Sequence, residues 1–147
     1  MEGSEIADAE EIIKYSSARF ILPDGSVDGA LFAPREADEG RSSVNRPLVF
    51  SSSLIEGVAK IRAVCRLTVR KSGRFVQANV GALRLAAHSL EQGLRVIVIA
   101  DPLEATSHFP EDPSHALILG LPSQTIMADL LADSLAACVN QTYPAIE

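Results

Sequence analysis

Runs of apolar residues along the chain predict a domain that contains both strands and helices. The clearest strand is 94–100, LRVIVIA, a short and nearly continuous apolar run rich in β-branched residues, which is typical of a strand buried on both faces. Shorter apolar runs predict further strands over 43–50, 74–80 and 115–120, with a brief helical turn as the alternative for the last. In the first of these, Pro47 restricts the strand to an edge, a bulge or a strand end, because proline donates no hydrogen bond to a sheet.

Apolar residues that recur three and four positions apart predict helices around these strands. The predicted helices are 4–15, 53–70, 81–92 and 124–139. Ser4 and Ser123 suit the N-cap positions of the first and the last helix, because a serine side chain accepts a hydrogen bond from the first turn. Gly93 suits the end of the third helix, since glycine tolerates the left-handed backbone that often ends a helix.

Turn residues predict a hairpin and two exposed loops. The sequence PDG at 23–25 separates the apolar segments 18–22 and 26–33, and both proline and Asp-Gly favour a tight turn between antiparallel strands. The segments 35–43 and 101–114 are polar or rich in proline and lack apolar periodicity, so we expect exposed loops there.

The order of these elements predicts one α/β or α+β domain that spans 1–147. Helices and strands interleave in the second half and follow an antiparallel start, which favours a single mixed sheet of about five or six strands covered by three or four helices. A chain of 147 residues with 47% hydrophobic and 22% charged residues is long and apolar enough to bury such a core. Aromatic residues make up only 5% of the chain, so we expect the core to be aliphatic.

Composition also narrows the class of protein. The longest apolar run is far shorter than the roughly 20 residues of a membrane-spanning helix, and the acidic opening of the chain is unlike a secretory signal. Cys65 and Cys138 lie in apolar helical patterns without metal-ligand spacing, and we interpret them as buried free thiols. Arginine outnumbers lysine by ten to three, and alanine is abundant. We therefore expect a soluble bacterial protein of the cytoplasm with no metal, no cofactor and no membrane partner.

Charge is divided into blocks along the chain, although the net charge is −6. Residues 57–90 hold seven bases and no acid, whereas the segments on either side are acidic. Arg62, Arg66 and Arg70 are four apart and form a basic ridge on the predicted helix 53–70. Such a ridge can bind phosphates or nucleic acid, but a pI near 5.0 and the lack of interleaved aromatic residues favour its neutralisation by the acidic N-terminal segment or by a partner.

Histidines are the candidates for acid–base chemistry. His115 stands where a proline-rich loop meets an apolar strand, a position that often carries catalytic groups in open sheets. Asp112 lies three residues earlier and is a candidate partner for the imidazole, and His108 belongs to the same loop. The alternative, which we favour, is that Asp112 makes turn hydrogen bonds and His115 is the polar first residue of a buried strand.

A second group of polar residues, in and after the loop 35–43, is a candidate for binding. It consists of Arg35, Arg41, Asn45 and Arg46. These side chains can donate many hydrogen bonds to an anionic ligand or to a carboxylate of a partner protein. The alternative is a solvated loop with local Glu–Arg pairs.

These candidates lead to three hypotheses for the function. No nucleophile elbow and no phosphate-binding loop is present, so our leading hypothesis is a non-enzymatic domain that binds another protein or a second copy of itself and is selected by charge. The first alternative is an enzyme or binding domain for a phosphorylated or anionic small molecule, in which His115 and Asp112 act with Arg46 and Arg35. The second alternative is nucleic-acid binding through the basic ridge.

Overall fold

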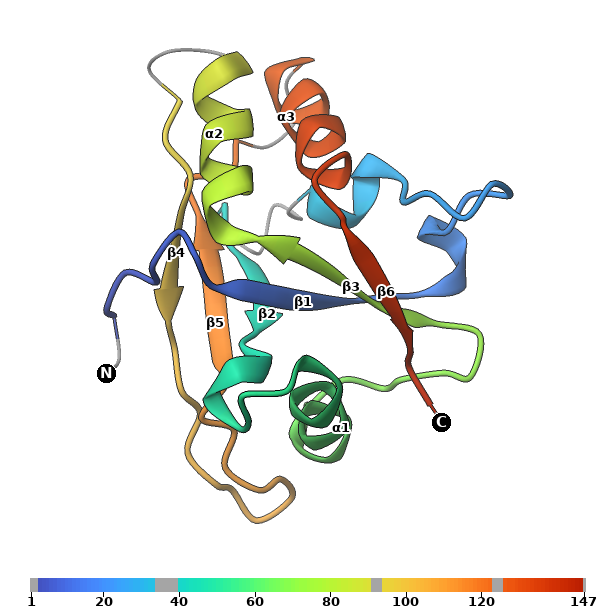
Figure 1. Cartoon of the computed structure of the whole chain (residues 1–147), viewed down its shortest axis with the longest axis vertical. Helices are drawn as coiled ribbons and strands as arrows, with labels where there is room; N and C mark the ends of the chain where they lie inside the picture. The colour runs from blue at the N-terminus through green and yellow to red at the C-terminus, as the bar shows by residue number, and fades with distance from the viewer. Residues whose placement is uncertain (1–2, 34–39, 91–93, 123–125, 147) are drawn as a thin grey trace.

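The chain folds around one six-stranded β-sheet (Figure 1). A computed structural model describes residues 3–33, 40–90, 94–122 and 126–146. The strands are β1 (Glu11–Ser16), β2 (Ser42–Asn45), β3 (Arg74–Asn79), β4 (Ile97–Ala100), β5 (His115–Leu119) and β6 (Gln141–Pro144). Their order across the sheet is β4-β5-β2-β1-β3-β6, and every neighbouring pair is antiparallel. The prediction of an α/β or α+β fold with one sheet of five or six strands is confirmed in its α+β form, and the sheet is antiparallel throughout where a mixed sheet was expected.

Three α-helices cover the sheet in the described part of the chain, within the predicted three or four. α2 (Val80–Leu90) and α3 (Ile126–Ala136) lie side by side on one face, and α1 (Leu54–Val64) lies on the other (Figure 1). Short 3-10 helices of the described segments connect the strands: η1 (Ala18–Phe20), η2 (Gly29–Phe32) and η4 (Pro47–Val49). Within the described ranges, none of the helices is both long and apolar enough to cross a membrane.

The two faces of the sheet pack differently. The face covered by α2 and α3, called here the two-helix face, forms an aliphatic core with these helices that includes Ile12, Val44, Val76, Leu83, Ile118 and Leu131. The face covered by α1, called here the one-helix face, has a smaller core that contains Ile13, Val58, Ile61, Phe75 and Ala145. Polar side chains continue the one-helix face, and a single row across the strands holds His115, Asn45, Ile13, Gln77 and Gln141.

The predicted helix over 4–15 is wrong, because this segment contributes to the sheet. Residues 3–6 pair with the outer edge of β4, and β1 lies in the middle of the sheet. Ile12 and Ile13 are both buried, at 2% and 0% exposure, and they point to opposite faces. A strand that is covered on both faces carries consecutive apolar residues instead of alternating ones, and for this reason the pair resembled one face of a helix.

Two predicted strand segments are shorter than the sequence indicated. In the strand predicted over 43–50, β2 ends before Pro47, which begins η4, as expected for a residue that cannot donate to the sheet. The hairpin predicted around 23–25 keeps one bridge, between Ile21 and Val27. Its two arms form η1 and η2 outside the sheet.

The sheet is nearly divided between β1 and β2. β1 pairs with β3 at six positions but with β2 at one, Ile13 with Asn45. Beyond this pair the two strands separate (Figure 1), and the Nζ of Lys14 donates a 3.0 Å hydrogen bond to the backbone oxygen of Ser43 across the opening. The sheet therefore consists of two half-sheets, β4-β5-β2 and β1-β3-β6, that are joined by a single residue pair.

Candidate functional site

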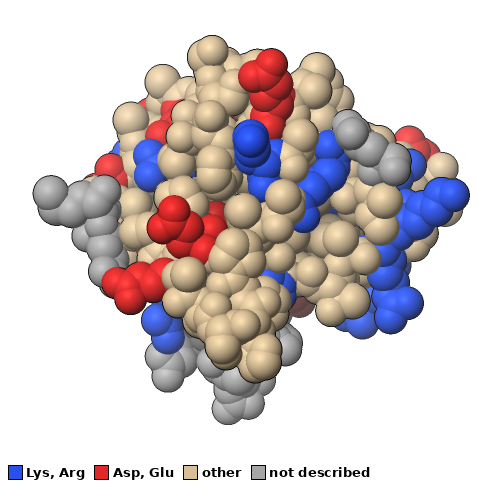
Figure 2. Space-filling view, turned by 90° about the horizontal axis from the view of Figure 1, so that it is seen from below, with Lys and Arg blue, Asp and Glu red and all other residues tan. Residues whose placement is uncertain are grey.

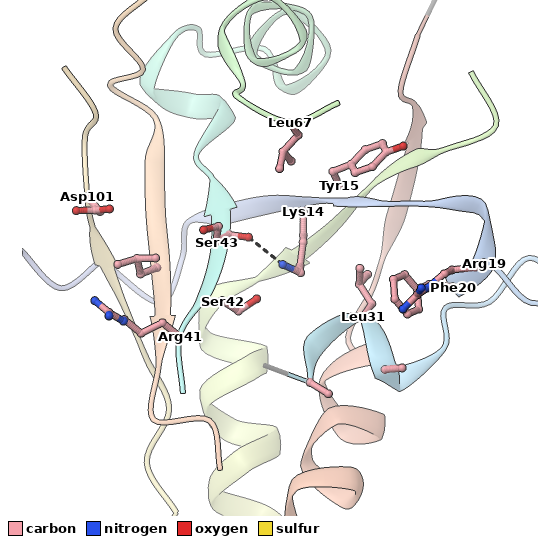
Figure 3. A pocket seen from close by; sticks show the side chains of 13 residues that line it. Lys14, Tyr15, Arg19, Phe20, Leu31, Arg41, Ser42, Ser43, Leu67 and Asp101 are labelled. Atoms are coloured by element: carbon pink, nitrogen blue, oxygen red, sulfur yellow. Dashed lines mark hydrogen bonds between the residues drawn. The ribbon is translucent and has the colours of Figure 1, made fainter. Parts of the chain in front are cut away.

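A hollow of about 710 Å³ lies where β1 and β2 separate (Figure 3). Lys14 and Ser42 line it from the two-helix side, and Tyr15, Ser43 and Leu117 line it from the other side. Side chains of neighbouring strand residues point to opposite faces of a sheet. Both sets line one hollow because the sheet is open at this point, so the hollow passes between the separated strands.

Three basic side chains line this hollow. Lys14 belongs to β1, Arg19 to η1, and Arg41 to the segment that precedes β2. Figure 3 shows Arg19 and Arg41 on opposite sides of the opening, with Lys14 between them. Among the described lining residues, Asp101 alone is acidic. Among the described lining residues, positive charge therefore exceeds negative charge, and such an excess attracts anions.

Apolar and aromatic side chains form the rest of the wall, and they include Phe20, Leu31, Leu67 and Leu117. The ring of Tyr15 packs edge-on against Phe75, with ring centres 5.7 Å apart. The hydroxyl of Tyr15 accepts a 3.0 Å hydrogen bond from the backbone N–H of Arg70, which fixes the ring beside the hollow. A wall of this kind suits a ligand that has apolar surface as well as anionic groups.

His115 has a carboxyl partner, but this partner is Asp101 and not the predicted Asp112. The Nδ1 of His115 lies 3.0 Å from the Oδ2 of Asp101 and 3.0 Å from the backbone oxygen of the same residue. Only 15% of the His115 side chain is exposed. Asp101 lines the hollow, so this pair joins the start of β5 to its wall. His108 is exposed in a turn around Thr106 and does not line the hollow.

Asp112 and Asn45 belong to a buried polar cluster. Asp112, Ser114 and Asn45 are 1%, 0% and 7% exposed. The Asp112 carboxyl group accepts hydrogen bonds from the Asn45 amide at 2.9 Å and from the N–H and hydroxyl of Ser114 at 3.0 and 2.7 Å. The Asn45 amide also donates to the Ser114 hydroxyl at 2.8 Å. This cluster anchors the loop 101–114 to β2, and it contains the turn hydrogen bonds expected of Asp112.

Arg46 forms an ion pair with the carboxylate of Glu10. Its Nε and a terminal nitrogen donate to the two oxygens of Glu10 at 2.5 and 2.9 Å. The hydrogen bond to Glu10 raises the pKa of Arg46 above its ordinary value, although burial opposes this. The pair ties the end of β2 to the segment before β1, so Arg46 acts as a structural tie. Arg35 lies outside the described residues.

The predicted ridge of Arg62, Arg66 and Arg70 does not form on one helix. α1 ends at Val64, and Cys65 is extended with a ψ of 144°. Beyond this point Cys65 and Val69 pack against the one-helix core. Arg66 and Arg70 therefore lie beyond the helix that was expected to align them.

The guanidinium groups of Arg62 and Arg66 donate to backbone carbonyls. Arg62 donates to the Pro144 oxygen at 3.0 and 2.7 Å. Arg66 donates to the oxygens of Glu104 and Pro110, and its guanidinium lies 5.5 Å from the ring centre of Phe109. Figure 2, which looks onto this side of the molecule from below, shows acidic side chains on the same face as the basic ones. The face is therefore mixed in charge.

A second polar cluster surrounds Glu11 on the one-helix face. The amides of Gln77 and Asn140 donate to one oxygen of Glu11 at 2.8 and 2.9 Å, and the Tyr143 hydroxyl donates to the Gln77 oxygen at 2.5 Å. Partial burial raises the pKa of Glu11, but hydrogen bonds from neighbouring amides outweigh it and hold this pKa below its ordinary 4.5. Burial and then the charge of Glu11 raise the pKa of Tyr143. The cluster ties β6 to the central strands.

Sequence reasoning missed three charged residues among the described residues that line the hollow. Lys14 lay inside the helix predicted over 4–15, Arg19 lay inside the predicted hairpin, and Asp101 was treated only as a loop residue. A strand assignment for β1 would have placed Lys14 on the same face as Ile12, because these two residues are two positions apart. The adjacent pair of isoleucines was the signal for such a strand.

Neither the cysteines, nor groups of metal-ligating residues, nor comparison with known proteins indicates another site in the described residues. Cys65 and Cys138 are free and half-buried, and burial raises the pKa of both thiols, which is typical of unreactive cysteines. In the part of the chain that the structure describes, no three His, Cys, Asp or Glu residues are grouped to hold a metal ion. Comparison with protein-family models, with curated proteins and with solved structures found no match for this chain.

Proposed function

We propose that this protein is a binding domain and that the hollow between β1 and β2 holds an anionic ligand or an anionic part of a partner. The observation that carries the proposal is that Lys14, Arg19 and Arg41 all line one hollow. These residues come from separate segments, and one acidic residue, Asp101, accompanies them among the described lining residues. Folding therefore gathers positive charge at the opening in the sheet.

The chemistry of the three cations favours a ligand with more than one anionic group. A guanidinium pairs with two oxygens of a carboxylate or phosphate at once, whereas the lysine ammonium acts as a point charge. Two unit charges 4 Å apart attract by about 1 kcal/mol in water and by several times more where water is partly excluded. Arg19 and Arg41 stand on opposite sides of Lys14 (Figure 3), so anionic groups at two ends of one ligand each meet a cation.

The polar residues near the hollow support a binding role more than a catalytic one. Asp112 is buried, already accepts three hydrogen bonds and does not line the hollow. His115 is held by Asp101, and no nucleophile is activated beside it among the described residues. A binding domain that selects its partner by charge is therefore the function that we propose.

Isothermal titration calorimetry with citrate and with inorganic pyrophosphate tests this proposal. We expect both anions to bind the wild-type protein, and we expect binding to weaken as salt is raised, because these charges are partly exposed. The double variant Arg19→Gln/Arg41→Gln should bind at least about tenfold more weakly, since two charge-assisted contacts are removed. Lys60→Gln is the matched control, because Lys60 is an exposed cation of α1 that does not line the hollow.

Three results would contradict the proposal. They are the absence of binding by both anions, an unchanged affinity in the double variant, and an equal loss in the Lys60→Gln control. Thermal unfolding of each variant shows whether the fold is retained, so a loss of binding can be assigned to the hollow.

A further inference from the structure

In β2, the backbone N–H and C=O groups of every second residue point toward β1. The N–H of Arg46 donates to the Ser114 oxygen on the β5 side at 2.9 Å, and residues of an antiparallel strand alternate in the direction of their backbone groups. Asn45 and Ser43 therefore direct their backbone groups toward β1. Asn45 meets Ile13 there, in the single pair that joins the two half-sheets.

The backbone of β1 shows the matching alternation. The N–H of Val80 donates to the Glu10 oxygen on the β3 side at 3.0 Å, so Ile13 and Tyr15 direct their backbone groups toward β2. A continued ladder would pair Tyr15 with Ser43, but the described strands have no such pair. Two strand edges therefore face each other across the hollow at these positions.

A side chain occupies part of this opening. Lys14 donates its Nζ hydrogen bond to the Ser43 carbonyl, the acceptor that a neighbouring strand would use. Ser43 itself is exposed. A carboxylate that draws the Lys14 ammonium to itself releases the Ser43 carbonyl for an N–H of the same ligand. Binding of a carboxylate by Lys14 is thus coupled to pairing of the ligand backbone with Ser43.

We propose that the ligand of the hollow is an extended peptide segment with acidic side chains, inserted as a strand between Tyr15 and Ser43. The inference rests on the proposed function, because it uses the same hollow and the same cations. Peptides that add to strand edges gain affinity from backbone hydrogen bonds and specificity from alternate side chains. One set of side chains reaches the Lys14 and Leu31 side of the hollow, and the other reaches the Leu67 side.

The size and lining of the hollow agree with a short peptide. Its volume of about 710 Å³ falls inside the range of roughly 300–1,000 Å³ that ligand sites occupy. A small inorganic anion would leave the apolar wall of Phe20, Leu31, Leu67 and Leu117 without a contact. An acidic peptide with apolar residues between its carboxylates engages both the cations and this wall.

Nuclear magnetic resonance of the nitrogen-15-labelled full chain tests the inference. The probe is a library of acetylated heptapeptides with glutamate at every second position and Val, Leu, Phe or Ser between. We expect its best members to bind at least tenfold more tightly than citrate and to slow amide hydrogen exchange at Tyr15 and Ser43. The same peptides with N-methylated backbone nitrogens are the matched control and should lose at least tenfold in affinity, because they keep the charge but lack the N–H donors.

The outcomes separate this inference from the proposed function. If citrate and the peptides bind equally, and N-methylation changes nothing, the hollow binds anions but not a strand, and the inference is overturned alone. If an oligouridylate binds more tightly than every peptide and leaves the exchange of Tyr15 and Ser43 unchanged, the ligand is a nucleic acid and the inference is also overturned. If no probe binds, both the inference and the proposed function fail.

Discussion

The two faces of the sheet share the same strands but are covered in different ways. On the two-helix face, α2 and α3 supply aliphatic side chains along the length of the strands, and the strand residues in that core are apolar. On the one-helix face, α1 covers a smaller core, and the polar clusters around Asp112 and Glu11 lie beside it. Burial of apolar area holds the first face together, whereas the second depends on hydrogen bonds as well.

The one-helix face has a loop and a strand where the two-helix face has its second helix. The loop 101–114 and the strand β6 pack beside α1, and neither has the internal hydrogen bonds of a helix. Polar groups that a loop buries must find partners in the rest of the fold. Asn45 donates a hydrogen bond to Asp112 of the loop, and Gln77, which is bonded to Glu11, accepts one from Tyr143 of β6. The predictions below test this comparison, from the largest expected effect to the smallest.

The largest loss of stability should follow a cavity on the two-helix face. Ile118 is 0% exposed in its core, and Ile118→Ala should lower the free energy of unfolding by about 3 kcal/mol, because the rigid surroundings cannot close the cavity. Unfolding in urea measures this loss. Leu85→Ala, at a residue of α2 that is 65% exposed, is the control and should change stability by less than about 0.5 kcal/mol. Equal losses in the two variants would contradict the role given to this core.

The next largest effect should come from the buried cluster of the one-helix face. Asp112→Ala removes an acceptor that serves Asn45 and Ser114, and it should cost about 2 kcal/mol, because buried donors are left without partners. Asp112→Asn keeps one acceptor oxygen and should cost less. Urea unfolding of both variants distinguishes them. If the Asn variant is as unstable as the Ala variant, charge rather than hydrogen bonding holds the loop.

A smaller effect is expected where Arg66 holds the same loop from outside. Arg66→Ala removes the contacts with the carbonyls of Glu104 and Pro110 and should cost about 1 kcal/mol. Hydrogen exchange should accelerate at the amides of Leu103 and Asp112, which bond to each other across the loop. Arg70→Ala is the control, since the described contact of Arg70 is through its backbone. Unchanged exchange in the Arg66 variant would show that the buried cluster holds the loop alone.

The smallest effect is a pH dependence from the cluster around Glu11. Because hydrogen bonds hold the folded-state pKa of Glu11 below 4.5, its contribution to stability is complete above that pH and is lost as the pH falls through the folded-state value. The free energy of unfolding of Glu11→Gln should therefore lie below that of the wild type at pH 6, and the difference should shrink as the pH is lowered below 4.5. A difference that stays constant with pH would contradict the lowered pKa.

The fold class could be predicted from sequence because most elements carry a local signal. The run LRVIVIA contains β4, the apolar periodicity of 81–92 covers all of α2 but its first residue, and that of 124–139 contains α3. The central strand could not be predicted in the same way. Its two buried isoleucines face different layers, and this depends on cover from helices far away in the chain.

The candidate site could not be predicted from sequence because it arises from an interruption of pairing. No local pattern shows that β1 and β2 pair at one position and then separate. The sequence identified Arg41 and Arg46 as neighbours in one polar group; in the structure Arg46 pairs with Glu10, and Arg41 lines the hollow. Two arginines that look equivalent in sequence thus take different places in the fold.

The near division of the sheet has a consequence for how the protein is made. One half-sheet takes its strands from 11–16, 74–79 and 141–144, and the other takes them from within 42–119. The two sets of strands alternate along the chain, because β3 of the first half lies between β2 and β4 of the second, and both halves contribute to the core of the two-helix face. Neither half can therefore be excised or transplanted as a continuous piece. During synthesis β1 can pair with β3 first, β4 and β5 then complete the other half-sheet with β2, and β6 joins last. The sheet is nearly divided into two half-sheets, but no single cut in the chain separates their strands.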